Sequence, residues 1–208
     1  MEAGTFTFLS GFLVTLFACA ALVRGKRFFR VALDETGSGP QKFHAVPTPR
    51  VGGIPIVLGL IGGLATLNLS AGSASSLSAT LLACAVPAFA GGLAEDLTRR
   101  VPVGTRLLLT FVAAGIGFFL LDARITAVDV PGFDWVLGFG VGSFAFTLFA
   151  VGGFANAINI VDGFNGLAGA VALIYVAAIA YVAHAVGDGQ VALACLLLGA
   201  AMAGFLIF

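Results

Sequence analysis

Polar residues interrupt an otherwise apolar stretch at residues 156–166, which read NAINIVDGFNG. Asn156, Asn159 and Asp162 follow one another at intervals of three, so on a helix they stay within a sector of about 120° and form one ladder. Asn165 would fall on the opposite side, but the two glycines that flank it can break the helix. Mg²⁺ prefers oxygen ligands and often binds through carboxylates and substrate phosphates, so the ladder predicts a metal or nucleotide site. An interhelical hydrogen-bond ladder is the structural alternative.

Two adjacent carboxylates, Glu95 and Asp96, end another apolar stretch in the segment GGLAEDLTRRVPVGTR. An unpaired carboxylate at a lipid boundary is costly, which favours a functional role. The alternative is a salt-bridged helix end, because Arg99 and Arg100 each follow a carboxylate by four residues. Adjacent helical residues project about 100° apart, so the two carboxylates cannot serve one ligand in the same way. We expect one to be catalytic and the other to support it.

A third polar cluster closes the first loop, where Lys42, His44 and Arg50 surround a Pro-Thr-Pro segment. The prolines favour an extended backbone, and the two glycines that follow let a ligand approach the start of the next helix. Basic side chains and a helix N-terminus both suit phosphate oxygens. The cluster therefore predicts a phosphate-binding loop, with an ordinary turn of snorkelling basic residues as the alternative.

The elements that must position these clusters are long apolar segments. Of the 208 residues, 60% are hydrophobic and 10% charged, which is unlike a soluble domain. About 20 apolar residues cross the hydrocarbon core as a helix. The sequence predicts an all-α polytopic membrane protein with about seven transmembrane helices, at 5–24, 51–69, 77–94, 107–121, 138–160, 167–184 and 191–208. The cysteines lie inside these spans without CxxC spacing, which indicates packing residues.

The distribution of basic residues orients the predicted spans. If the first span exits to the cytoplasm, nine of the ten lysines and arginines lie on that side, and Arg124 alone lies on the other. The positive-inside rule therefore places the N-terminus outside and the segments 25–50, 95–106 and 161–166 in the cytoplasm. All three polar clusters then share one face of the membrane. The segment 125–136 is expected outside, as a short hairpin or strand pair.

Together the three clusters resemble motifs of the polyprenyl-phosphate N-acetylhexosamine-1-phosphate transferases, the family that includes the phospho-N-acetylmuramoyl-pentapeptide translocases. KFHAVPTPRVGGIPI resembles the family's H-x-x-P-T-P-R-x-G-G segment, GLAEDLTRRVPVGTRLL its acidic-pair motif and NAINIVDGFNGLAG its N-x-x-N-x-x-D-G-x-D-G-L-A motif. The resemblance covers nearly the whole chain. Its Pro-Thr-Pro-Arg form is more similar to the sugar-phosphate transferases of O-antigen, teichoic acid or capsule synthesis than to the pentapeptide enzyme.

The resemblance implies an enzyme that transfers a HexNAc-1-phosphate from a UDP-sugar to polyprenyl (undecaprenyl) phosphate and releases UMP. It implies Mg²⁺ (or Mn²⁺) as cofactor and an inner (plasma) membrane location in a bacterium, with the active site facing the cytoplasm. The product would initiate a lipid-linked glycan of the cell envelope, as in lipopolysaccharide or cell-wall synthesis. The expected partners are both substrates and membrane lipid; nucleic acid is not expected, and a homodimer stays open.

Site residues follow from the same resemblance. It implies that Lys42, His44 and Arg50 bind the substrates' phosphates, and that Asn156, Asn159 and Asn165 are substrate-binding residues. The catalytic candidates are Asp96, Glu95 and Asp162, with Asp162 and Asp96 as metal ligands. In two places the sequence departs from the family pattern: Glu95 stands where the family commonly has Asp, and Asn165 replaces the second Asp of the third motif. Asp96 is therefore the safer catalytic candidate of the acidic pair.

Several alternatives remain at this point. A polytopic transporter also carries intramembrane acids, but it would place them near the bilayer midplane. A non-catalytic relative that binds lipid-linked sugars is the other alternative. Residues 1–208 are expected to form a single transmembrane transferase domain that is incomplete at its C-terminus, since family members continue into a Gly-Asp-x-Gly segment and a His-rich loop that this sequence lacks. The isolated chain is therefore expected to show negligible transfer.

Overall fold

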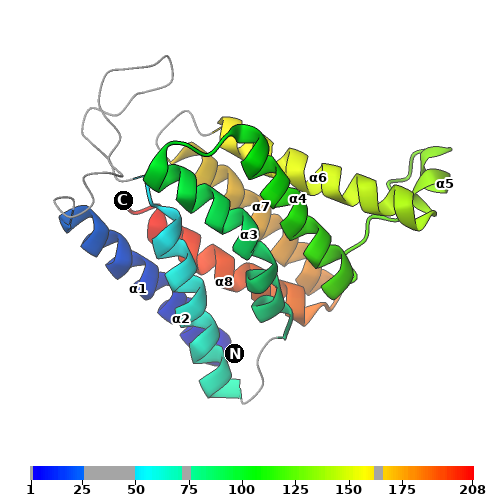
Figure 1. Cartoon of the computed structure of the whole chain (residues 1–208). Coiled ribbons are helices and arrows are strands. Elements are labelled where there is room, and N and C mark those ends of the chain that lie inside the picture. The colour runs from blue at the N-terminus through cyan, green and yellow to red at the C-terminus, as the bar shows by residue number, and fades with distance from the viewer. Residues whose placement is uncertain (1, 26–49, 72–75, 162–165) are drawn as a thin grey trace. The chain divides into compact units, whose positions relative to one another are not determined.

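The computed structural model describes residues 2–25, 50–71, 76–161 and 166–208, and these ranges contain eight helices and no strand (Figure 1). The helices are α1 (Glu2–Arg24), α2 (Gly53–Ala71), α3 (Ser76–Thr98), α4 (Val103–Leu120), α5 (Phe133–Leu137), α6 (Gly140–Val161), α7 (Leu167–Ala185) and α8 (Gly189–Phe205). Each of the seven segments predicted to span the membrane corresponds to one helix.

The helices form because backbone N–H and C=O groups have no water to bond in hydrocarbon, so each segment must satisfy them internally. Five helices are long and apolar enough to cross a membrane: α1, α3, α4, α6 and α7. The apolar parts of α2 and α8, Gly53–Leu69 and Gly189–Phe205, are shorter. The prediction of an all-α polytopic membrane protein is confirmed.

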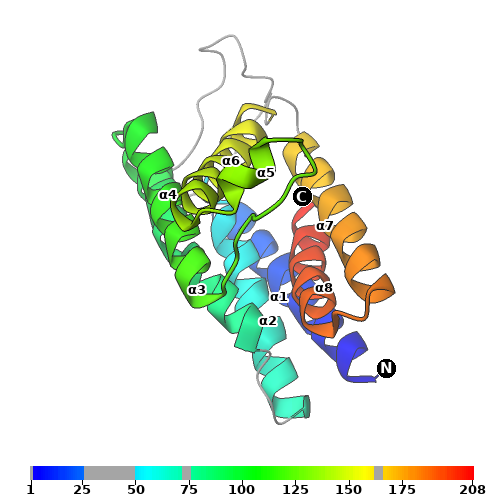
Figure 2. The same cartoon turned by 90° about the vertical axis from the view of Figure 1, so that its right-hand side faces the viewer.

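The described helices fall into two compact units. The first contains α1, α2, α7 and α8, and residues 96–98 of α3 group with it. Within this unit α1 contacts α2 and α8, and α7 lies beside α8 (Figure 2). The second unit contains α3 from Thr80 to Glu95, together with α4, α5 and α6. Two of the three polar clusters, the acidic pair and the asparagine ladder, have members in this second unit.

Small residues allow α1, α2 and α8 to approach closely in the first unit. The Thr15 hydroxyl is buried and donates a hydrogen bond of 3.0 Å to the Gly11 carbonyl of its own helix. A Cβ atom at Gly59 of α2 would overlap this hydroxyl and would lie 2.8 Å from the Gly11 carbonyl oxygen. A Cβ atom at Gly204 of α8 would lie 2.6 Å from the carbonyl oxygen of Phe12. Close packing of this kind replaces the hydrophobic effect as the driving force between helices in lipid.

We expect Gly59→Ala to lower the thermal unfolding temperature of the detergent-solubilised protein. The added methyl group must displace backbone as well as the Thr15 side chain, and overpacking of this kind costs about 1–3 kcal/mol. Gly117→Ala in α4 is the matched control, because a Cβ atom there meets nothing within 4 Å and alanine favours the helix. Equal unfolding temperatures for the two variants would contradict the close approach of α1 and α2.

The connection between α4 and α6 differs from the predicted hairpin or strand pair, and that prediction is wrong. Residues 121–132 contain no strand, and α5 follows them. Side chains of α5 and α6 take up the backbone groups that a ladder would use: Ile125 N–H donates to Thr147 Oγ1 (3.1 Å), Ser143 Oγ donates to Ile125 O (2.9 Å) and Val128 N–H donates to Asp134 Oδ1 (2.8 Å). The connection is therefore held by hydrogen bonds to α5 and α6 instead of by strand pairing within residues 121–132.

Candidate active site

The acidic pair lies in the last turns of α3, just before a short connection to α4. Arg99 follows the helix in the left-handed region (φ 55°), and Pro102 caps α4 with an extended backbone. Glu95 Oε2 accepts a hydrogen bond of 2.7 Å from the backbone N–H of Val101. The Glu95 carboxylate therefore holds the turn that leads into α4, and the division of the pair into a catalytic and a supporting member stays a prediction.

Asp96 is half-buried and projects about 100° around α3 from Glu95. The alternative of two i,i+4 pairs assumed that the helix continues through Arg99 and Arg100. Although α3 ends at Thr98, the Arg99 N–H still donates to the Glu95 carbonyl at 2.7 Å, so the salt-bridged helix end stays an alternative. The assignment of Asp96 as the catalytic member stays a prediction.

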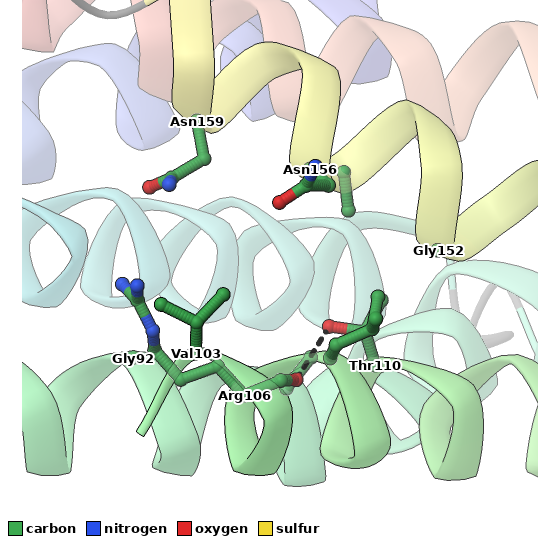
Figure 3. Close-up of a pocket in the computed structure, with 10 residues that line it drawn as sticks. Gly92, Val103, Arg106, Thr110, Gly152, Asn156 and Asn159 are labelled. Carbon is green, nitrogen blue, oxygen red and sulfur yellow. Dashed lines mark hydrogen bonds between the residues drawn. The ribbon is translucent and has the colours of Figure 1, made fainter. Parts of the chain in front are cut away.

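A cavity of about 170 Å³ lies between α3, α4 and α6 in the second unit (Figure 3). Its lining comes from three helices: Ala88 and Gly92 of α3, Val103, Arg106, Leu107 and Thr110 of α4, and Gly152, Ala155, Asn156 and Asn159 of α6. Two of the three ladder residues thus line one pocket. Glu95 follows Gly92 by three residues, so it continues the pocket-lining face of α3.

Helix geometry explains why α6 presents its asparagines to this cavity. Gly152, Asn156 and Asn159 are spaced by four and three residues and share one face. A Cβ atom at Gly152 would overlap the Phe111 ring, so the glycine allows α6 to lie close to α4. Gly91 has the same function between α3 and α4, since its Cβ atom would lie 2.6 Å from Leu109 Cδ1. The pocket is therefore built by close helix packing with amides on one wall.

Arg106 of α4 faces the asparagines, and sequence reasoning missed it. Its Nε atom is buried and has no hydrogen-bond partner among the described residues. Figure 3 shows its guanidinium and the amides of Asn156 and Asn159 pointing into the space between α4 and α6. Leaving a buried donor unsatisfied costs about 1–3 kcal/mol, and more for a charged group. An oxyanion bound in the pocket would remove this cost, and guanidinium groups match phosphate geometry.

A signal for Arg106 is nevertheless present in the sequence. It is the one charged residue of α4, VGTRLLLTFVAAGIGFFL. An ionisable residue inside an apolar span is a functional-site hypothesis by default.

The remaining predicted site residues are distributed as follows. Arg50 is half-buried in the first unit, directly before the fully buried Val51 and the start of α2. Lys42, His44, Asp162 and Asn165 lie outside the described residues. Gly166, the second of the two flanking glycines, lies in the left-handed region (φ 73°) directly before α7 begins at Leu167, and the expected interruption at Gly163 lies outside the described residues.

The described residues fit an anion better than a metal ion. No group of three His, Cys, Asp or Glu side chains within the described ranges could hold a metal. The amide oxygens of Asn156 and Asn159 are suitable ligands for a hard cation, but the Arg106 guanidinium in the same pocket opposes one. Asp162 and Asp96 stay the predicted metal ligands.

Comparisons with known proteins agree with the motifs. Residues 78–208, which include every residue that lines the pocket, match the family described as glycosyl transferase family 4. A phospho-N-acetylmuramoyl-pentapeptide-transferase of Geobacillus kaustophilus (strain HTA426) is 28% identical over 95% of this chain and 64% of its own length. A putative UDP-N-acetylglucosamine–dolichyl-phosphate N-acetylglucosaminephosphotransferase of Sulfolobus acidocaldarius is 30% identical over 95% of this chain and 60% of its own length. The chain thus spans slightly less than two thirds of these relatives.

No solved structure matches the chain. The family match covers more than half of the sequence and contains the helices that build the pocket. The protein is a member of glycosyl transferase family 4.

Proposed function

We propose that the protein transfers a HexNAc-1-phosphate from a UDP-sugar to a polyprenyl phosphate and releases UMP. The observation that carries the proposal is the pocket in which Arg106, whose buried Nε atom has no hydrogen-bond partner among the described residues, faces Asn156 and Asn159. The printed names of the two relatives, both phosphosugar transferases, supply the substrate class. An acceptor with a polyisoprenoid tail explains why such a pocket lies between membrane helices.

In the proposed reaction an oxygen of the lipid phosphate attacks the sugar-bound phosphorus of the donor. A new P–O bond forms, and the bond from this phosphorus to the bridging oxygen breaks, so UMP leaves with the electron pair. A phosphate monoester has a second pKa of about 6 and is largely nucleophilic at neutral pH. Positioning and charge stabilisation therefore contribute more than removal of a proton.

The chain's own residues have distinct roles in this proposal. Arg106 donates to phosphate oxygens whose charge rises as UMP leaves, and the two asparagine amides orient the donor. Asp96 is the carboxylate assigned to the lipid phosphate, and Glu95 is a positioning residue that acts through Val101. Mg²⁺ (or Mn²⁺), held by Asp162 and Asp96, would shield the negative charge of the two phosphate groups.

The proposed site also has an orientation. With its N-terminus outside, the protein lies in the inner membrane of a bacterium and binds the nucleotide sugar from the cytoplasm, where Lys42, His44 and Arg50 contribute to phosphate binding. The product would be the first intermediate of a lipid-linked envelope glycan.

The test compares membranes of cells that overproduce the protein from its own locus with membranes of cells that lack it. UMP release is measured with a panel of UDP-HexNAc donors, with and without added polyprenyl phosphate and Mg²⁺. We expect release that requires the gene, the lipid phosphate and one or few donors. Donor binding without UMP release would support a non-catalytic relative instead, and donor or lipid movement without UMP release would support a transporter.

A further inference from the structure

The connection between α4 and α6 carries an exposed aromatic surface that the proposed function does not use. Phe133 and Trp135 of α5 and the following Phe139 form it, and we call these three residues the aromatic patch. Trp135 is 73% exposed and Phe139 is 53% exposed. The two rings contact each other edge to face, with centroids 4.9 Å apart. Large apolar side chains grouped in this way indicate an interaction surface.

The aromatic patch is held firmly by the rest of its unit. Leu137, which follows Phe133 by one turn of α5, is only 1% exposed, and the Phe133 ring packs edge to face on Phe146 of α6 at 5.2 Å. Asp134 accepts the Val128 N–H, which fixes the chain before α5 to α5 itself. The backbone that carries the patch is therefore fixed, and Figure 1 shows α5 beside the first turns of α6.

The surroundings of the patch identify lipid as the partner. Both helices that enter the connection are candidate membrane spans, so the connection between Leu120 and Gly140 must lie at a membrane surface whichever way the chain is oriented. The exposed Phe119 (71%) at the end of α4 and Val141 (81%) at the start of α6 continue the apolar surface into the lipid-facing sides of these spans.

Charged residues of the same connection lie beside these apolar side chains. Asp122 and Arg124 form an exposed ion pair, and Arg124 also lies 5.0 Å from the centroid of the Phe118 ring. Asp129 is exposed as well. Tryptophan and other aromatic residues next to charged groups are typical of the boundary between hydrocarbon and head groups. We propose that the aromatic patch is a membrane anchor that lies in the head-group region of the bilayer.

This anchor would set the depth of the pocket. Along α4, Arg106 precedes Leu120 by 14 residues, and along α6, Asn156 follows Gly140 by 16 residues. At about 1.5 Å per residue these distances are roughly 21 and 24 Å, close to the hydrocarbon thickness of about 30 Å. With the patch in one interface, the pocket lies near the opposite interface, where a water-soluble donor and a lipid phosphate can both reach it.

Trp135 is the only tryptophan of the chain, so its fluorescence tests the anchor directly. The full protein is placed in nanodiscs whose phosphatidylcholine is brominated either near the head group or near the chain ends. We expect a larger loss of emission with the shallow bromine than with the deep bromine, and little quenching by acrylamide in water. Strong acrylamide quenching without bromolipid quenching would overturn the anchor, and so would protection from both quenchers, which would indicate a protein partner such as a second copy.

A matched control moves the single tryptophan along the same unit. The double variant Trp135→Phe with Phe149→Trp places it near the middle of α6, at a position that is exposed on that span. The order of quenching should reverse, with the deep bromine more effective. An unchanged order in the two proteins would show that the method does not resolve depth at Trp135 and would remove the support for an anchor at the interface.

Discussion

Replacement of Arg106 by glutamine is expected to lower transfer of the sugar phosphate by about 10²- to 10³-fold, the loss usual when one preorganised donor to a developing oxyanion is removed. Glutamine keeps a polar side chain, but it is shorter than arginine and removes the positive charge and the guanidinium fork. Arg106→Lys should retain part of the activity, because it keeps the charge without the two parallel donors. The measurement is UMP release in membranes at matched protein amounts.

Arg124→Gln is the control for this substitution. It removes the same charge from an exposed side chain that pairs with Asp122 at the other end of α4. Surface ion pairs contribute little to stability, about 0–1 kcal/mol, so transfer should stay near normal. Since Arg106 Nε is buried without a partner, Arg106→Gln should also leave the unfolding temperature unchanged or higher. Normal turnover by Arg106→Gln would remove Arg106 from the site.

Replacement of Asp96 by asparagine should lower transfer by about 10²-fold or more, since it removes a charge that the proposed reaction uses. Glu95→Gln should cost less than about tenfold. The carboxylate of Glu95 already accepts the Val101 N–H at 2.7 Å, and a glutamine amide oxygen can accept the same hydrogen bond. The two isosteric changes therefore separate a catalytic carboxylate from a positioning one.

A third variant, Glu95→Ala, checks the positioning role. It leaves the Val101 N–H without its acceptor at the start of α4, so the protein should unfold at a lower temperature than Glu95→Gln. If Glu95→Gln proved more damaging to transfer than Asp96→Asn while both proteins unfolded normally, the roles of the two carboxylates would have to be exchanged.

The helices could be predicted from the sequence because membrane helices need long apolar runs. The residues at which they begin and end were predicted less accurately. The span expected to begin at residue 107 begins at Val103. Pro102, the residue before it, adopts the extended conformation that precedes a helix, and the first N–H groups of a helix have no partner within the helix, so the missing N–H of proline costs nothing there. This difference of four residues puts Arg106 inside α4 instead of at its boundary. The span expected to end at 94 continues to Thr98 and includes both carboxylates.

The sequence predicted only part of the candidate site, because contacts between distant helices have no local sequence pattern. The spacing of Asn156 and Asn159 predicts a shared helix face, and the structure places both at one pocket. That Arg106 faces these asparagines depends on the close packing of α4 and α6 at Gly152 and Phe111. No local sequence pattern predicts this packing. The hairpin prediction failed similarly, since alternation within 125–134 could not show that Ser143 and Thr147 of a later helix would bind Ile125.

The first unit combines helices from distant parts of the sequence, and this affects how the helices can assemble while the chain is being synthesised. Gly63 of α2 packs against Leu197 of α8, about 130 residues later. At a synthesis rate of about 5–20 residues per second, α1 and α2 therefore leave the ribosome on the order of ten seconds before α8 arrives. During that time the side of α2 around Gly63 that α8 later covers must stay open beside lipid or an insertion factor while four other helices enter the membrane. Ribosome pausing within the segment that encodes α3 to α6 would prolong this half-assembled state and lengthen its exposure to membrane proteases.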